Sequence, residues 1–80
     1  MDKHRNEYLD SFIGKRVAIK RPQGLYFGIF DYANGYYFID KPDFRNSDGV
    51  YIKYAKWSCR KSGIRKKDIR KIGDAPIYKG

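Results

Sequence analysis

The residues able to do chemistry in this 80-residue chain are chiefly cations and aromatic rings. The stretch IRKKDIRKI, residues 64–72, places five Lys or Arg and one Asp among three isoleucines. Residues 51–80 hold ten of the 18 Lys and Arg residues but only Asp68 and Asp74 of the nine acidic residues. Such an uneven positive charge favours a polyanionic partner, most often nucleic acid, over a surface that is charged only for solubility.

Residue types that support catalysis or metal binding are scarce. Cys59 is the only cysteine, so no intrachain disulfide forms, and His4 is the only histidine, which excludes a Cys/His zinc site. Cys59 has no partner base near it in the sequence, so a catalytic thiol is not expected. No paired-carboxylate, phosphate-loop or metal-ligand spacing is present. We therefore expect a protein that is not an enzyme and needs no cofactor.

The elements that must position these side chains follow from periodicity. Apolar residues at helical spacing predict a helix over residues 3–13, with Asp2 as N-cap and Gly14 after its end. Alternating or apolar runs then predict strands at residues 16–20, 25–33, 36–40 and 50–57. Residues 21–24 read as a turn and residues 41–49 as an exposed loop.

Two positions in these strands carry specific expectations. Gly28, in the middle of the second strand, should mark a sharp bend or a close backbone approach. Asn34-Gly35 should form a two-residue hairpin turn, since both central residues of that turn need a positive φ. In the strand at 50–57, Val50, Ile52 and Tyr54 would face the core, whereas Trp57 would face outward, where an intersubunit contact is its favoured role.

The stretch IRKKDIRKI allows two structures. As a helix it would bring Ile64, Ile69 and Ile72 to one face, but nine residues make a marginal helix. The favoured alternative is a charged turn over residues 65–68, with the isoleucines on either side packing into the core and a short last strand after it. Asp68 is expected to cap or pair locally. A helix and several short strands joined by tight turns predict a small antiparallel barrel in one domain.

The chain begins without the apolar stretch of a signal peptide and has no run long enough to cross a membrane, so we expect a cytoplasmic protein without a membrane partner. Residues 74–80 form a short tail with no clear periodicity. A domain of this size buries only about 60% of its unfolded surface, so tight packing or oligomerisation must support it.

In layout and motifs the chain resembles the Sm-like RNA-binding family over about residues 5–73. Ile64, Arg65, Ile69 and Ile72 match the hydrophobic and Arg positions of the second Sm motif, with Lys66 where the family usually has Gly. The first motif is represented by a helix that ends in Gly-Lys before a strand, and by two glycines in the following turn and strand. Asn34, Tyr36 and Phe38 stand where the family has Asp, an aromatic or hydrophobic residue, and Asn.

This resemblance implies an N-terminal helix followed by a five-stranded Sm-like barrel. It implies a homo-oligomeric ring in which the fourth strand of one subunit pairs with the fifth strand of the next, and it implies single-stranded RNA as the partner. RNA is bound by cations for the phosphates and by aromatic faces for the bases. The expected RNA-binding residues are Asn34, Tyr36, Arg65, Lys66 and Lys67, with a possible secondary basic surface at Lys3, His4, Arg5, Arg60 and Lys61.

Other interpretations stay open for these residues. Tyr36 could be a core or cross-strand aromatic, and Asn34 is accounted for by the hairpin turn alone. The alternative for the whole chain is a monomeric or dimeric chromo- or Tudor-like barrel that binds duplex DNA or a protein tail. A structural or adaptor protein without nucleic acid is a third possibility.

Overall fold

A computed structural model describes residues 3–73, which form one short helix and seven strands around a shared core. The helix α1 spans Glu7–Asp10, and two single 3-10 turns follow later, η1 (Lys61–Gly63) and η2 (Lys66–Asp68). The strands are β1 (Arg16–Arg21), β2 (Gly24–Ala33), β3 (Tyr36–Asp40), β4 (Asp43–Arg45), β5 (Tyr51–Lys53), β6 (Lys56–Cys59) and β7 (Ile69–Gly73).

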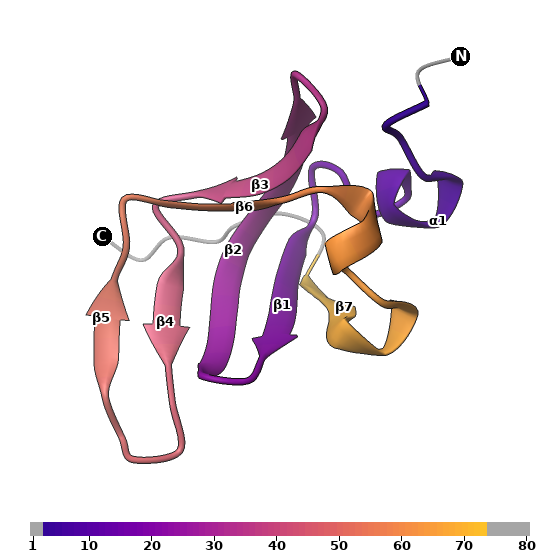
Figure 1. Ribbon diagram of the computed structural model, residues 1–80. Helices are drawn as coiled ribbons and strands as arrows, with labels where there is room; N and C mark the ends of the chain where they lie inside the picture. The colour runs from indigo at the N-terminus through magenta and orange to yellow at the C-terminus, as the bar shows by residue number, and fades with distance from the viewer. Residues whose placement is uncertain (1–2, 74–80) are drawn as a thin grey trace.

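The long strand β2 organises the antiparallel sheet, whose main order is β5-β4-β2-β1-β7 (Figure 1). The first part of β2, Leu25–Phe27, pairs with β4, whereas its last part, Phe30–Ala33, pairs with β3. The change of partner falls at Gly28, where a Cβ would collide with the side chain of Ile39. The expected close approach at Gly28 is therefore confirmed.

The core lies where the inward faces of these strands meet. Tyr37 and Ile39 of β3 are fully buried with Phe30 of β2, and the rings of Phe30 and Tyr37 stack at 5.3 Å between centroids. From outside the sheet, Leu9 of α1 and Ile64 of the segment between η1 and η2 complete this cluster. Alternation along β3 thus buries every second residue and leaves Tyr36, Phe38 and Asp40 on the outward face.

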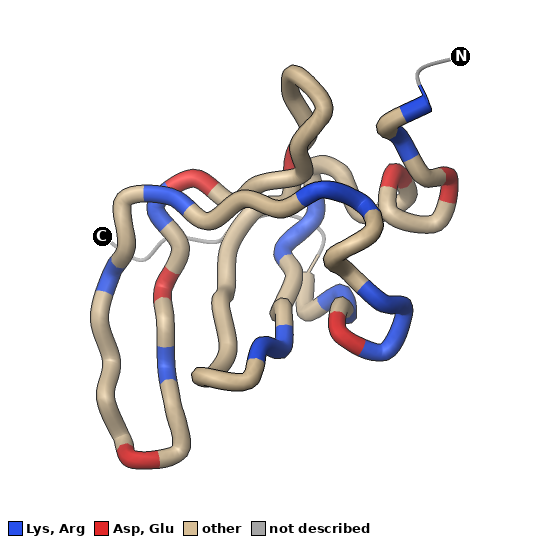
Figure 2. Tube along the Cα trace, viewed as in Figure 1, with Lys and Arg blue, Asp and Glu red and all other residues tan. Residues whose placement is uncertain are grey.

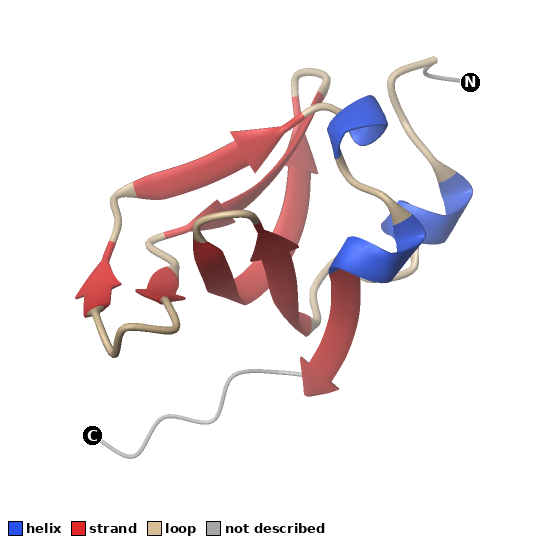
Figure 3. Cartoon of the chain, turned by 60° about the horizontal axis from the view of Figure 1, so that its bottom comes forward, coloured by secondary structure: helices blue, strands red, loops and turns tan. Residues whose placement is uncertain are grey.

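Residues 3–73 form an open sheet of seven strands instead of the expected closed barrel of five strands. Figure 3 shows the strands curving around a common interior, with the helical turns gathered at one end. Two interruptions produce the extra strands, one at Lys41-Pro42 and one at Tyr54-Ala55. Pro42 has no backbone N–H to donate, and Lys41 has a φ of 51°. The interruptions lie side by side, since the Lys41 N–H donates to Ala55 O at 3.0 Å and the Tyr54 N–H donates to Pro42 O at 3.0 Å.

The segment expected to be an exposed loop contains a strand, and the strand after it is divided. Phe44 of β4 is buried, opposite Ile52 of β5. The break at Tyr54-Ala55 shifts the alternation, so Trp57 turns inward and stacks on Tyr26 at 5.9 Å between ring centroids. The expectation of an outward Trp57 was wrong for this reason. Val50, Ile52 and Tyr54, all expected to face the core, are exposed.

The helix is much shorter than the expected span of residues 3–13. Asn6 caps it by accepting a hydrogen bond from the Leu9 N–H at 3.0 Å, and the α-helix ends at Asp10. The expected cap, Asp2, lies outside the described residues. Residues after Asp10 continue as turns to Gly14, whose φ of 83° suits its expected place after the helical segment.

The stretch IRKKDIRKI forms a turn followed by a strand, as the favoured interpretation predicted. The 3-10 turn η2 contains Lys66, Lys67 and Asp68, and β7 begins at Ile69. Ile64 and Ile69 are buried on either side of the turn, whereas Ile72 is exposed rather than packed in the core. The cations therefore lie in solvent on a turn whose flanks are fixed by the two buried isoleucines.

Candidate functional site

The outward face of β3 and β6 combines aromatic rings with cations. In the antiparallel register Phe38 lies opposite Ser58, and Asp40 lies opposite Lys56. Because outward residues alternate along both strands, Tyr36, Phe38 and Asp40 share this face with Lys56, Ser58 and Arg60. A shallow pocket of about 230 Å³ lies over this face, and it is lined by Ala33, Asn34, Tyr36, Phe38, Lys56 and Ser58. We call Tyr36, Phe38, Lys56 and Arg60 the cation–aromatic platform.

Each ring of the platform carries a cation over it. The guanidinium carbon of Arg60 lies 4.8 Å from the ring centroid of Tyr36, and Lys56 Nζ lies 4.6 Å from that of Phe38. These distances fall within the range of cation–π attraction. Tyr36 is 40% exposed, so one ring remains open to a partner. The platform therefore presents positive charge and planar apolar surface at the same two positions.

Asn34 lies at the rim of the platform in the β2–β3 hairpin. It has a φ of 52° and the next residue, Gly35, has a φ of 86°, which confirms the predicted two-residue turn. Asn34 also lines the pocket over the platform. The turn accounts for the residue type at this position, and the same turn places the amide beside Tyr36.

The N-terminal segment brings two of the expected secondary basic residues, His4 and Arg5, against the sheet, and Lys61 contacts this segment. The ring of His4 lies against Gly35 of the hairpin, within ordinary contact distance of a Cβ there. Arg5 lies over the ring of Tyr32 at 4.4 Å, and its backbone carbonyl accepts a hydrogen bond from Lys61 Nζ at 3.3 Å. Because Tyr32 pairs with the inward Tyr37, Arg5 lies on the face of the sheet opposite to that of Tyr36 and Phe38. Lys3 is exposed at the start of the described chain.

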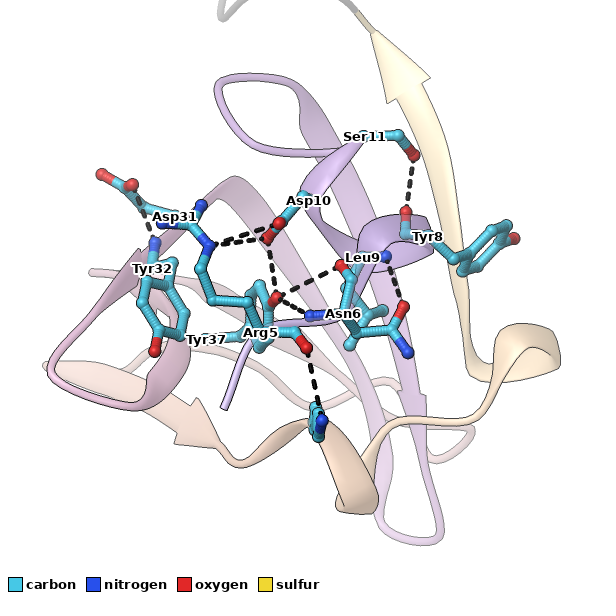
Figure 4. Close-up of polar contacts among 10 residues, drawn as sticks. Arg5, Asn6, Tyr8, Leu9, Asp10, Ser11, Asp31, Tyr32 and Tyr37 are labelled. Carbon is cyan, nitrogen blue, oxygen red and sulfur yellow. Dashed lines mark hydrogen bonds and ion pairs between the residues drawn. The ribbon is translucent and has the colours of Figure 1, made fainter. Parts of the chain in front are cut away.

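Hydrogen bonds of the Tyr37 hydroxyl connect the N-terminal segment to the sheet (Figure 4). Its hydroxyl accepts from the Asn6 N–H at 2.7 Å and donates to Asp10 Oδ1, also at 2.7 Å. Burial, together with the hydrogen bond to Asp10, raises the pKa of Tyr37 to about 12. Asp10 also pairs with Arg5 at 3.2 Å, which raises the pKa of that guanidinium. A buried side chain of β3 therefore determines where the cation at Arg5 lies.

The three remaining expected RNA-binding residues lie elsewhere. Arg65 pairs with Asp68 at 3.1 Å, Lys66 lies 5.2 Å from the ring centroid of Tyr8, and Lys67 lines a pocket with Lys20 and Arg21. Arg65 lines that pocket as well, and neither cation lines the one beside Tyr36. The structure thus divides the expected site into two basic regions. Asp68 pairs locally, as expected.

Sequence reasoning missed Phe38 and Lys56 as site residues. Phe38 drew attention only as a replacement for an amide, and Lys56 only as one positive charge among many. The sequence signal for these two residues was alternation. Lys56, Ser58 and Arg60 are spaced by two residues, as are Tyr36 and Phe38, so side chains of the two strands share one face if the strands are neighbours. It became visible only once the register of β3 with β6 was known.

Within residues 3–73, no group of His, Cys, Asp and Glu is arranged to hold a metal ion. The same residues include no helix that is both long and apolar enough to cross a membrane. Cys59 is partly buried, and a Cβ at Gly63 would collide with its Sγ.

Comparison with protein-family models finds no matching family, and comparisons with curated proteins and with solved structures find no significant match.

Proposed function

We propose that this protein binds single-stranded RNA without catalysis, on the outward face of β3 and β6. The observation that carries the proposal is the pairing of a cation with each aromatic ring of the platform, Arg60 with Tyr36 and Lys56 with Phe38. Unpaired bases stack on aromatic faces and on guanidinium planes, and each stacked base contributes about 1–3 kcal/mol.

The charge around the platform supports a polyanion as the partner. Lys61 follows the platform residue Arg60 directly, and Figure 2 shows Lys or Arg at the start of β6 and again where β6 leads into η1, with uncharged residues between them. These cations would neutralise phosphates while the rings contact bases. A duplex hides the faces of its bases inside the stack, so a flat aromatic platform suits a single strand better.

We also propose that copies of the chain assemble into a ring through sheet edges, as the Sm-like resemblance implies. Counting β3 with β4, and β5 with β6, as two bent strands gives the five-strand order of that family. Among residues 3–73, β7 pairs only with β1, and β5 pairs only with β4, which leaves an open edge on each side. Exposed apolar residues lie on both edge strands, Ile52 on β5 and Ile72 on β7. Open apolar edges of this kind favour pairing with another chain.

The test of RNA binding is the affinity for a fluorescently labelled oligouridylate after nuclease treatment of the purified protein. We expect Tyr36→Ala and Arg60→Ala each to weaken binding about tenfold, since each removes a stacking surface or its cation. Arg60→Lys keeps the charge but loses the planar guanidinium, so it should fall between Arg60→Ala and the wild type. Ser47→Ala, in the exposed loop after β4, is the control and should leave the affinity unchanged.

Two results would contradict the proposal. Equal affinity of wild type and Tyr36→Ala would remove the platform as the site. A preference for duplex over single strand, or for a peptide, would favour the chromo- or Tudor-like alternative. Steep salt dependence is expected in every nucleic-acid case, so it does not discriminate between them.

A further inference from the structure

A second basic region lies at the end of β1, beside η2. It contains a pocket of about 360 Å³ that is lined by Lys20, Arg21, Pro22, Arg65, Lys67 and Asp68. Four of these six residues are cations, and one is a carboxylate. The pocket differs from the platform in having no aromatic residue in its lining, so it offers charge without a stacking surface.

Two of its arginines are held in place by groups of the protein. Asp68 Oδ2 accepts from Arg65 Nε at 3.1 Å and from the Arg65 backbone N–H at 3.2 Å. Asp68 is only 8% exposed, and the hydrogen bond from Arg65 lowers its pKa, so the carboxylate stays charged. Arg21 Nη1 donates to Gly63 O at 2.8 Å. Each guanidinium is therefore oriented by one bond and retains further N–H groups for a ligand.

The two lysines are not neutralised by the protein. Lys20 and Lys67 are both exposed, and no ion pair links either of them to an acidic residue among residues 3–73. With Asp68 already engaged by Arg65, the pocket keeps a net positive charge that its own residues do not balance.

We propose that this pocket binds a cluster of phosphate groups, in the form of a free oligophosphate or of a polynucleotide backbone. Guanidinium forks fit phosphate oxygens in pairs, and ammonium groups act as point charges beside them. The absence of aromatic residues from the lining means that phosphates, not bases, are recognised.

The pocket is separate from the cation–aromatic platform. Lys20 and Arg21 pair with Leu25 and Gly24 at the start of β2, whereas β3 pairs with its last four residues. No residue lines both this pocket and the pocket over the platform. This inference does not depend on the proposed function of the platform.

Isothermal titration with sodium tripolyphosphate at fixed ionic strength tests the site on the full chain. We expect saturable binding with one ligand per chain, and an affinity about tenfold weaker for Lys20→Gln/Lys67→Gln, which removes two unpaired cations from the pocket. The control, Lys41→Gln/Lys53→Gln, loses the same charge outside this pocket and should stay within about twofold of the wild type. Circular dichroism checks that both variants fold.

An abasic single-stranded oligonucleotide distinguishes the two sources of phosphate. The wild type could bind the abasic oligonucleotide but not tripolyphosphate. If Lys20→Gln/Lys67→Gln then loses the binding of the oligonucleotide, the pocket is supported with a nucleic-acid backbone as its ligand. Equal losses in both double variants, or no binding of either probe, would overturn the proposal. Tyr36→Ala should leave tripolyphosphate binding unchanged, so failure of the platform and failure of the pocket give different results.

Discussion

At the scale of single residues, the outward and inward neighbours Tyr36 and Tyr37 have complementary roles. Tyr36 presents its ring to solvent with Arg60 over it, whereas Tyr37 is fully buried and holds the N-terminal segment through Asn6 and Asp10. Asp10 in turn pairs with Arg5. The hydroxyl of Tyr37 thus positions the Arg5 cation through Asp10, on the inward side of β3.

Tyr37→Phe should destabilise the fold by about 1–3 kcal/mol, because the Asn6 N–H and the Asp10 carboxylate lose a buried partner. The pKa of Tyr37 is raised from 10.0 to about 12, so the folded state favours the neutral form of this hydroxyl. Its contribution is fully present below pH 10 and is lost as the pH rises towards about 12. Urea unfolding across this range measures both effects.

The matched control is Tyr8→Phe, which removes a hydroxyl from an exposed ring. Its stability should stay within about 0.5 kcal/mol of the wild type. A loss of alkaline stability in Tyr37→Phe as large as in the wild type would show that another group titrates in this range.

Residue-level prediction from the sequence succeeded where the cause was local. The turn at Asn34-Gly35 follows from backbone sterics, and the pairing of Asp68 with Arg65 involves residues three positions apart. The inward position of Trp57 did not follow, because it depends on an interruption at Tyr54-Ala55. Of the four platform residues, Tyr36 and Arg60 were among the expected binding residues, whereas Phe38 and Lys56 were not, because their place beside the other two depends on strand register.

At the scale of elements, β2 decides how the sheet is shared between two groups of strands. It pairs with β1 from Gly24 to Ile29 on one side, and on the other side it changes from β4 to β3 near Gly28. The sequence predicted this strand and the importance of its glycine. It did not predict β4, because Pro, Asp, Asn and Gly around Phe44 read as a loop and a three-residue strand has too few positions to show alternation.

Gly28→Ala should destabilise the protein by about 1–3 kcal/mol, because its Cβ would overlap the side chain of Ile39 in a filled core. Urea denaturation of the single variants and of Gly28→Ala/Ile39→Ala forms a double-mutant cycle. The double variant should be less destabilised than the sum of the two single variants, because truncation of Ile39 makes room for the new methyl group. Strict additivity would show that contact with Ile39 is not what requires glycine.

At the scale of the whole molecule, charge and open edges are the dominant features. A net charge of +9 on 80 residues repels other copies of the chain, so self-association needs specific contacts that outweigh the repulsion. The sequence predicted a mainly β protein with an N-terminal helix, and the structure agrees with that much. It did not predict whether the sheet closes, because closure depends on pairing between strands distant in sequence. Among residues 3–73 the open sheet leaves β5 and β7 as edge strands, and the proposed assembly would cover them.

Assembly through these edges predicts that the purified wild type, treated with nuclease, elutes as one species whose mass by light scattering is several times 9.5 kDa. Ile52 and Ile72 are 44% and 43% exposed on the strands β5 and β7. Ile52→Asp and Ile72→Asp should each reduce the mass, because a carboxylate at a paired edge would be buried without a partner. Ser47→Asp adds the same charge in an exposed loop and should leave the mass unchanged. A wild type that is already monomeric would remove the ring, and the platform would then bind RNA as a single copy.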